Sequence, residues 1–121
     1  MPTKGRVDKG KRGEDAAVLH LKKFGYQIVA RNFRCRYGEI DIIARDGDTL
    51  VFVEVKSRTS ARFGSPFESV DIRKQKKLRQ LAVIYLQSVE EYVGNVRFDV
   101  VGVYLTPAGE VTEINVIKHA F

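Results

Sequence analysis

Three charged residues lie within two runs of the sequence that are otherwise rich in valine and isoleucine. Asp41 lies in the run Glu-Ile-Asp-Ile-Ile, and Glu54 and Lys56 lie in Val-Phe-Val-Glu-Val-Lys. Charges inside apolar strands are costly unless they are paired or bound to a metal. Two carboxylates without a nearby histidine offer hard oxygen ligands, which suit Mg²⁺ or Mn²⁺ rather than zinc. Together with a lysine that offsets the charge of a transition state, they predict a site for phosphodiester hydrolysis.

The two runs are predicted to form a β-hairpin, because they alternate on either side of an Asp-Gly-Asp turn. A two-residue loop at 47–48 places Asp41 opposite Glu54 and Glu39 opposite Lys56. Opposed Cβ atoms lie about 4.5–5.5 Å apart, so facing carboxylates repel each other unless a cation lies between them. This register therefore predicts a cation site.

A two-residue loop at 46–47 is the alternative, and it places Asp41 opposite Phe52 and Glu39 opposite Glu54. In both registers the charged side chains of the two strands share one face of the sheet. A three-residue loop would divide them between the faces and would need a bulge to restore the hydrophobic pattern. Loops of even length are therefore favoured.

A fourth candidate, Glu14, lies in a segment with helical periodicity. The helix is predicted over 13–24, and Glu14 shares one face of it with Ala17 and Leu21. Glu14 therefore points towards the sheet, where a buried glutamate needs a partner. The metal site or Lys56 would supply that partner.

The rest of the chain must hold these side chains in place. Its 121 residues fit one domain, predicted over 13–121 after a flexible basic arm at 1–12. The order αβββαββ predicts an α/β fold in which a mixed five-stranded sheet is flanked by helices. Around the hairpin, the predicted elements are a strand at 26–33, a loop at 58–67, a helix at 68–87, and strands at 96–105 and 110–117.

The net charge of +6 is concentrated in two segments. Residues 1–12 and residues 71–79 each hold five basic residues against one acidic residue. Such clusters on a nearly neutral body favour a polyanion partner, because each neutralised phosphate releases counterions. The alternative is a solvated helix face and a basic tail. The residues predicted to contact nucleic acid are Lys9, Lys11, Arg12, Arg58, Arg62, Arg73, Lys74, Lys76 and Lys77.

The sequence argues against several other classes of protein. Cys35 is the only cysteine, which excludes an intrachain disulfide and a multi-cysteine zinc site. No apolar run approaches the roughly 20 residues of a membrane span, and the N-terminus lacks the apolar segment of a secretory signal. We therefore expect a cytoplasmic protein without a membrane partner.

The motifs resemble those of the YraN family of predicted endonucleases, which is related to archaeal Holliday junction resolvases and to the wider PD-(D/E)-x-K nucleases. The resemblance covers about residues 13–103. It departs from the motif that names the class at Ile40, where that motif has proline. The matching segments are Gly13-Glu14, Gly-Glu-Ile-Asp-Ile-Ile-Ala at 38–44, Val-Phe-Val-Glu-Val-Lys-Ser-Arg at 51–58, Gly64, and Arg-Phe-Asp at 97–99.

The resemblance implies a restriction-endonuclease-like fold and a role for each motif residue. Asp41 and Glu54 would be metal ligands, and Lys56 would be the catalytic lysine. Glu14 would be the helix acid that completes the metal site, as in the resolvases. Gln75, on the inward stripe of the second predicted helix, resembles a glutamine that supports the site in some of these nucleases.

Several residues have a structural interpretation beside the functional one. Glu54 and Lys56 would be a surface ion pair if their strand lay at an edge, although the valine-rich flanks argue against an edge. Glu39 either supports the site or has a structural role, as a partner of Lys56 or as a surface acid near the loop. Arg58 and Arg62 either contact phosphate or solvate a loop, while an ion pair on a neighbouring strand is favoured for Arg97 and Asp99.

The predicted function is a Mg²⁺- or Mn²⁺-dependent endonuclease acting on structured DNA, such as branches, flaps or nicks. Phosphate contacts position a substrate without specifying its sequence, so we expect preference for structure. A homodimer is expected by analogy with the resolvases alone. The alternatives are a non-catalytic nucleic-acid-binding module with the same fold, and a ribonuclease or a subunit that requires a partner protein. The complete set of Asp41, Glu54 and Lys56 favours an enzyme.

Overall fold

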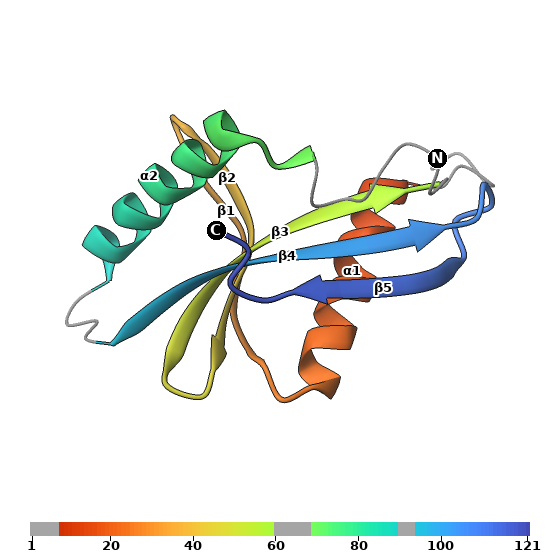
Figure 1. The fold of residues 1–121 in the computed structure, drawn as a ribbon, viewed down its shortest axis with the longest axis horizontal. Helices are drawn as coiled ribbons and strands as arrows, with labels where there is room; N and C mark the ends of the chain where they lie inside the picture. The colour runs from red at the N-terminus through yellow and green to blue at the C-terminus, as the bar shows by residue number, and fades with distance from the viewer. Residues whose placement is uncertain (1–7, 60–68, 90–93) are drawn as a thin grey trace, which may run out of the picture.

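The computed structural model describes residues 8–59, 69–89 and 94–121, apart from the side chain of Lys9. Within these residues the elements follow the predicted order αβββαββ, and the predicted α/β fold with a mixed five-stranded sheet is confirmed. The elements are α1 (Lys9–Lys23), β1 (Gln27–Cys35), β2 (Gly38–Asp46), β3 (Thr49–Arg58), α2 (Ile72–Ser88), β4 (Asn95–Leu105) and β5 (Val111–Ile117) (Figure 1).

The strands lie in the sheet in their sequence order. β3 and β4 are parallel, and each other neighbouring pair is antiparallel. A parallel pair needs a long connection, which here contains α2. β3 is therefore the central strand, and its residues from Leu50 to Glu54 are all buried. Burial on both faces explains why this run is apolar almost without interruption.

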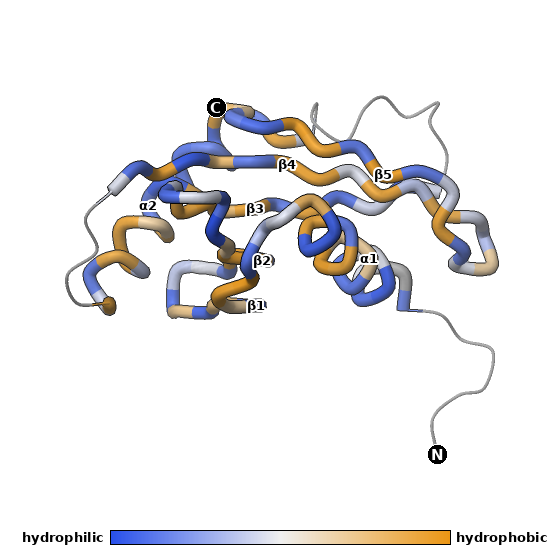
Figure 2. Tube along the Cα trace, turned by 90° about the horizontal axis from the view of Figure 1, so that it is seen from below, coloured by the Kyte–Doolittle hydropathy of each residue, from blue (hydrophilic) through white to orange (hydrophobic). Residues whose placement is uncertain are grey.

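Each face of the sheet has its own hydrophobic core. Leu21 of α1 belongs to one core with Val53, whereas Leu81 of α2 belongs to the other core with Phe52. In Figure 1 α1 lies behind β4 and β5, and α2 lies beside the β1–β2 hairpin. Figure 2 shows hydrophobic stretches along β3 and β4, with α1 beneath them. Glu54 and Phe52 are two residues apart on β3, so their side chains lie on the same face of the sheet. The side chain of Glu54 therefore faces α2.

The start of α1 differs from the prediction. Asp8 caps the helix, and its side chain accepts a hydrogen bond of 3.0 Å from the backbone N–H of Lys11. α1 therefore begins at Lys9 rather than at residue 13, and Lys9, Lys11 and Arg12 belong to the helix instead of a flexible arm. Residues 1–7 of the predicted arm lie outside the described residues.

The second helix begins later than predicted. It starts at Ile72 rather than at residue 68, because Asp71 is its cap and accepts a hydrogen bond of 2.9 Å from the Lys74 N–H. In the parts of the chain that the structure describes, no helix is long and apolar enough to cross a membrane.

The β2–β3 hairpin adopts the first of the two predicted registers. Asp46 pairs with Thr49 across a loop of Gly47 and Asp48. Gly47 has a φ of 61°, a left-handed conformation that glycine adopts without steric strain. The prediction of a hairpin with an even loop is confirmed.

The hairpin opens where the charged residues begin. β2 and β3 pair as far as Ile42 and Val53, whereas β3 and β4 remain paired as far as Arg58. Beyond Ile42 the β1–β2 hairpin diverges from β3, as Figure 1 shows. We call this divergence the fork. When the register is extended by one residue beyond the pair of Ile42 and Val53, Asp41 lies beside Glu54.

The alternation of β2 breaks at the fork. Ile42 belongs to the core under α1, whereas Ile40, two residues earlier, belongs to the core under α2. The β1–β2 ladder is interrupted at Asp41 and at Asn32, which has a φ of 54°. The strict alternation expected of a strand, which would place Ile40 and Ile42 on one face, is therefore broken in β2. Glu39 consequently faces away from the α2 side, rather than sharing a face with Glu54.

Candidate metal centre at the fork of the sheet

Asp41 lies at the fork, where its side chain takes the place of a strand partner for β3. Its Oδ2 accepts a hydrogen bond of 2.8 Å from the backbone N–H of Val55. Burial raises the pKa of the Asp41 carboxyl to about 8, and the hydrogen bond to Glu54 and the negative charge of Glu54 contribute to the rise. Asp41 and Glu54 therefore form a carboxyl pair that retains a proton at neutral pH unless a cation is bound.

Glu54 is the more buried acid of this pair, with 6% of its surface exposed. Its Oε2 lies 3.0 Å from Nζ of Lys74 and 4.0 Å from Nζ of Lys56. Lys56 approaches from the same strand, as predicted, whereas Lys74 approaches from the first turn of α2. Since β3 is central and Glu54 is buried, the alternative of a surface ion pair on an edge strand is excluded.

The two lysines share one carboxylate, and each alters the pKa of the other. Burial lowers the pKa of Lys56, and its hydrogen bond with Lys74 lowers it further. Burial also lowers the pKa of Lys74, but hydrogen bonds with Lys56 and Glu54 outweigh burial and raise it. Lys56 is thus the lysine that gives up its proton more readily, which suits a group beside an attacking water.

The Asp41–Glu54 pair fits a magnesium ion. Mg²⁺ commonly takes one or two carboxylates and fills its remaining positions with water and substrate phosphate. In residues 8–59, 69–89 and 94–121, no group of three or more His, Cys, Asp or Glu side chains is arranged to hold a metal. Two carboxylates from adjacent strands are enough for Mg²⁺ or Mn²⁺, but too few for a structural zinc site.

Glu14 approaches this centre from α1 but is held by β1. Its Oε1 accepts hydrogen bonds of 3.0 Å from Arg31 and from Asn32. These partners differ from the predicted ones, which were the metal site or Lys56. The negative charge of Glu14 nevertheless contributes to the raised pKa of Asp41, so Glu14 lies near the centre. Its role as a metal ligand stays a prediction that requires its side chain to leave Arg31.

Gly13 explains how α1 comes so close to the fork. A Cβ at this position would overlap the hydroxyl of Ser57 and would lie 3.2 Å from Ser57 Cβ. The helix backbone therefore approaches β3 next to Lys56 because residue 13 has no side chain. Gly13 thus allows α1 to approach β3 closely. Glu14, the next residue, is directed towards β1.

A hollow of about 720 Å³ lies at the fork and is lined by residues of α1, β1, β2 and β3, among them Asp41 and Lys56. This volume is within the range of about 300–1,000 Å³ that is typical of ligand sites. Glu39 also lines the hollow, but it pairs with Arg34 at 2.6 Å. The prediction of Glu39 as a partner of Lys56 is therefore wrong.

Gln75 supports the start of α2. Its Nε2 donates a hydrogen bond of 3.0 Å to the backbone carbonyl of Val70. This bond ties the segment before α2 to the first turn of the helix, from which Lys74 reaches Glu54. In this structure the support that Gln75 provides therefore acts through the backbone.

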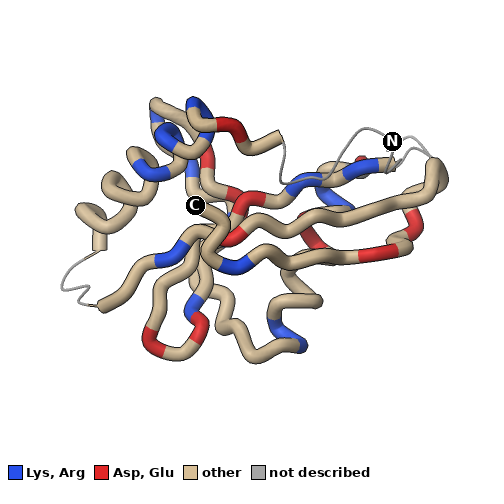
Figure 3. Tube along the Cα trace, viewed as in Figure 1, with Lys and Arg blue, Asp and Glu red and all other residues tan. Residues whose placement is uncertain are grey.

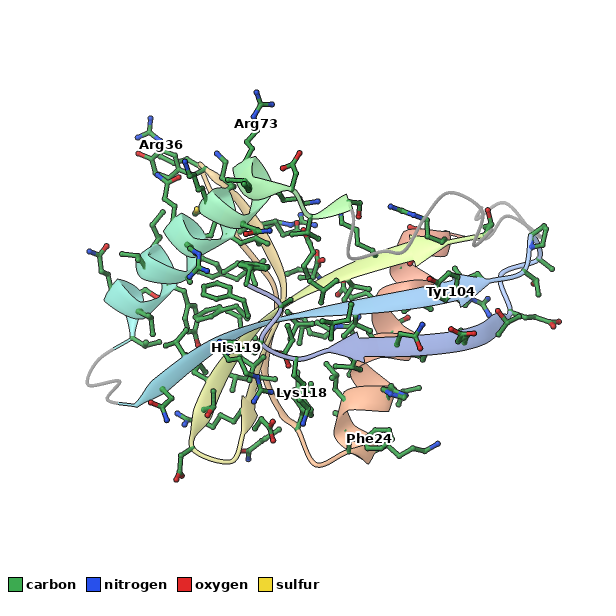
Figure 4. All side chains as sticks on the ribbon, in the orientation of Figure 1. Phe24, Arg36, Arg73, Tyr104, Lys118 and His119 are labelled. Atoms are coloured by element: carbon green, nitrogen blue, oxygen red, sulfur yellow. The ribbon has the colours of Figure 1, made fainter. Side chains whose placement is uncertain are left out.

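The four basic residues at 73–77 of α2 divide into three that are exposed and one that is engaged. Arg73, Lys76 and Lys77 are exposed, and Figure 3 shows basic residues gathered on the first half of α2. In Figure 4 Arg73 and Arg36, at the tip of the β1–β2 hairpin, extend from the same end of the molecule. Lys74, in contrast, pairs with the buried Glu54.

The other predicted nucleic-acid contacts are distributed around α1 and the end of β3. Lys11 and Arg12 are exposed on the first turns of α1. Arg58 lines the hollow at the fork. Arg62 and the side chain of Lys9 lie outside the described residues.

The contact between Lys74 and Glu54 was not predicted. Lys74 was expected, like its basic neighbours, to contact nucleic acid. Lys74 lies one helical turn before Leu78, which is buried against the sheet. That spacing places both residues on one stripe of the helix, and it is the signal in the sequence that Lys74 faces the sheet.

A second buried acid, Asp99, lies away from the fork and is fully surrounded by donors. It is 0% exposed. Its carboxylate accepts hydrogen bonds from Arg97 at 2.8 Å, from the Tyr26 hydroxyl at 2.9 Å and from the His119 N–H at 3.0 Å. Arg97 also pairs with Asp46 at 2.8 Å. The favoured interpretation of Arg97 and Asp99 as a structural ion pair is confirmed.

Comparison with known proteins identifies relatives along most of the chain. The pattern of the uncharacterised protein family UPF0102 matches residues 13–103. A UPF0102 protein of Caldicellulosiruptor saccharolyticus is 50% identical over 112 residues, which cover 93% of this chain and 95% of the relative. A UPF0102 protein of Moorella thermoacetica is 48% identical over 119 residues, which cover 98% of this chain and 99% of the relative. These names assign no activity.

Proposed function

This chain belongs to the uncharacterised protein family UPF0102, and from the site at the fork we propose that it is a Mg²⁺- or Mn²⁺-dependent endonuclease. The observation that carries the proposal is the carboxyl pair of Asp41 and Glu54, with Lys56 beside it. Like charges held together in a buried place have a raised pKa and a strong affinity for a cation. The resemblance of the motifs to the YraN family is borne out by the family match.

Each residue of the centre has a distinct task in this proposal. Asp41 and Glu54 hold the metal, which when bound polarises a phosphate and lowers the pKa of a water. The Val55 N–H orients Asp41 through the hydrogen bond at 2.8 Å. Lys56, whose pKa is lowered by burial, orients the attacking water or offsets the charge that develops on the phosphate.

The proposed substrate is structured DNA, such as a branch, a flap or a nick. The exposed Arg73, Lys76 and Lys77 on α2, and Arg58 at the hollow, supply contacts to phosphate. Such contacts position a duplex without reading its bases, so the shape of the DNA selects the site of cutting. Assembly into a homodimer, by analogy with resolvases, would let two centres act on the two strands of a junction.

The test incubates the purified protein with labelled four-way, flapped, nicked and linear DNA, and with matched RNA, in Mg²⁺, Mn²⁺ or EDTA. We expect metal-dependent cutting of a structured DNA by the wild type and by Glu113→Gln, a control on the exposed face of β5. Asp41→Ala and Glu54→Ala are expected to bind the same DNA without cutting it. Cutting of RNA in preference to DNA would make the protein a ribonuclease.

A non-catalytic binding module, or a subunit that requires a partner, is the second candidate function. The observation that favours it is the ion pair of Lys74 with Glu54 at 3.0 Å, because a cation already neutralises one of the two metal ligands. Salt-sensitive DNA binding that is indifferent to EDTA and to Asp41→Ala, with no cutting of any substrate, would support this candidate and contradict the autonomous nuclease.

A further inference from the structure

Lys74 is a second cation on the most buried acid of the centre. Its Nζ lies 3.0 Å from Oε2 of Glu54, a full ångström closer than Nζ of Lys56 at 4.0 Å. The side chain of Glu54 is 7% exposed and that of Lys74 is 37% exposed. The ion pair thus joins a fixed, buried carboxylate to an ammonium group that still reaches the surface.

The position of Lys74 is set by the helix that carries it. Its backbone N–H is bonded to the capping carboxylate of Asp71, and the next residue, Gln75, is bonded to Val70 O. The first turn of α2 is therefore fixed, and the long Lys74 side chain spans the distance to β3. Four rotatable bonds allow the ammonium group to move while the backbone remains in place.

Without a metal, the carboxyl pair needs such a cation. Asp41 and Glu54 lie close enough to share a hydrogen bond, and a buried carboxylate without a partner is strongly unfavourable. Lys56 at 4.0 Å is at the limit of an ion pair. Lys74 is therefore the main positive charge on Glu54 in the metal-free protein.

The same oxygen cannot satisfy both Lys74 and a divalent ion. A metal ligand directs its lone pairs at the metal, and a second positive charge 3 Å away would be repelled by it. We propose, as an extension of the nuclease function proposed above, that Lys74 is a built-in counter-ion of the centre. It neutralises Glu54 in the metal-free state, competes with the metal for this carboxylate, and turns towards substrate phosphate once the metal has displaced it.

This role separates Lys74 from its basic neighbours. Arg73, Lys76 and Lys77 are exposed on the same helix, so they can contact phosphate whether or not a metal is bound. Lys74 becomes available for phosphate only after it leaves Glu54. Metal binding and phosphate binding are therefore coupled through one side chain, and each is expected to strengthen the other.

The coupling is tested by Mn²⁺ binding in the absence of nucleic acid, measured by isothermal titration calorimetry. The proteins are the wild type, Lys74→Met, Lys74→Arg and Lys77→Met, the last being a control for charge on the same helix. We expect Lys74→Met to bind Mn²⁺ about five- to tenfold more tightly, because the substitution removes the ammonium group that competes with the metal for Glu54. A tenfold change in affinity corresponds to the loss of one modest interaction. Lys74→Arg and Lys77→Met are expected to bind as the wild type does.

Thermal unfolding in EDTA and in Mn²⁺ gives a second, independent readout. Lys74→Met is expected to melt below the wild type in EDTA, and to gain more from Mn²⁺, because ligand binding stabilises the folded state by mass action. If Lys74→Met does not fold without metal, Glu54→Gln/Lys74→Met removes both charges and is expected to restore folding in EDTA.

The outcomes distinguish this inference from the proposed function. Unchanged or weaker Mn²⁺ binding by Lys74→Met, with normal binding by the wild type, overturns the counter-ion role and leaves the nuclease proposal in place. No Mn²⁺ binding by the wild type, or binding that Asp41→Ala and Glu54→Ala retain, overturns both.

Discussion

Asp99 on β4, which is buried, and Asp41 on β2, which is half-buried, are acids on either side of the central strand, and their surroundings differ in kind. Asp99 accepts hydrogen bonds from Arg97, Tyr26 and the backbone of His119. Within the described part of the chain, Asp41 has one backbone donor and a second carboxyl group as its neighbour. Complementary donors make a buried acid a structural element, whereas a like charge makes it a site that awaits a cation.

The pKa changes follow the same division. At the Asp99 cluster, burial raises the pKa of Tyr26, and the hydrogen bond to Asp99 contributes, so the hydroxyl stays a donor. At the fork, burial and Glu54 raise the pKa of Asp41 to about 8. The raised pKa of Tyr26 keeps its hydroxyl protonated, while the raised pKa of Asp41 favours a proton that a bound metal would displace. Figure 4 shows where the Asp99 cluster lies: His119, whose backbone N–H is bonded to Asp99, and its neighbour Lys118 lie below α2 in this view.

The largest expected effect is on catalysis by the fork. We expect Asp41→Asn to lower the rate of metal-dependent DNA cutting by at least about a thousandfold, roughly 4 kcal/mol of transition-state stabilisation. The amide can still accept the Val55 hydrogen bond, so the fold is retained. Single-turnover cleavage measures the rate of cutting, and circular dichroism of the same sample measures whether the fold is retained. Cutting at the wild-type rate would show that the carboxyl pair is not the centre.

At the Asp99 cluster the expected effect is on stability. Asp99→Ala leaves Arg97 and Tyr26 without their shared acceptor in a buried place, and we expect the free energy of unfolding to fall by about 3–4 kcal/mol. Urea denaturation in EDTA measures it, with Glu113→Gln as the exposed control. A loss below that of the control would place Asp99 among the functional acids rather than the structural ones.

The next largest expected difference between Asp41 and Asp99 is in the pH dependence of stability. The folded-state pKa of Asp41, about 8, is above its ordinary value of 3.8, so the native state binds more protons than the unfolded state between those values. Stability conferred by the protonated form is therefore lost as pH rises from about 4 to 8. Asp41→Asn is expected to be more stable than the wild type by about 2–3 kcal/mol at pH 7 in EDTA. Urea midpoints from pH 5 to pH 8 that show a constant difference would contradict this.

The smallest expected effect is at Glu14, which belongs to neither cluster. Its partner Arg31 has 36% of its side chain exposed, so we expect Glu14→Gln to change the free energy of unfolding by less than about 1 kcal/mol. A loss of Mn²⁺ affinity in the same variant would support its predicted role as a metal ligand. Unchanged affinity would assign Glu14 to the attachment of α1 to β1.

The parts of the fold that depend on periodicity were predictable from the sequence. Loop parity narrowed the hairpin to two registers, because a side-chain period of two links the faces of both strands to the length of the turn, and the structure adopts the first of them. The helix starts were misplaced because Asp8 and Asp71 act as caps, and capping aspartates look like ordinary surface charges in a basic segment. Local patterns therefore predicted the identity of the elements more accurately than the residues at which they begin.

The arrangement at the fork was less predictable, because it depends on a break in periodicity. The left-handed backbone of Asn32 is uncommon for a residue other than glycine, and nothing in the neighbouring sequence marks it. The contact of Lys74 with Glu54 joins residues of two elements, and a single sequence contains no direct signal of that distance. The acids themselves were identified because charged residues are rare in a central strand.

The hairpin that carries both proposed metal ligands also has a place in the order of folding. Pairing β2 with β3 closes a loop of two residues, Gly47 and Asp48, whereas pairing β3 with β4 must bring together segments separated by the whole of α2. Local contacts form earlier than distant ones, because closing a longer loop costs more entropy. Asp41 and Glu54 are therefore expected to meet while α2, and Lys74 with it, is still undocked. A divalent cation present at that stage would relieve their repulsion and accelerate refolding.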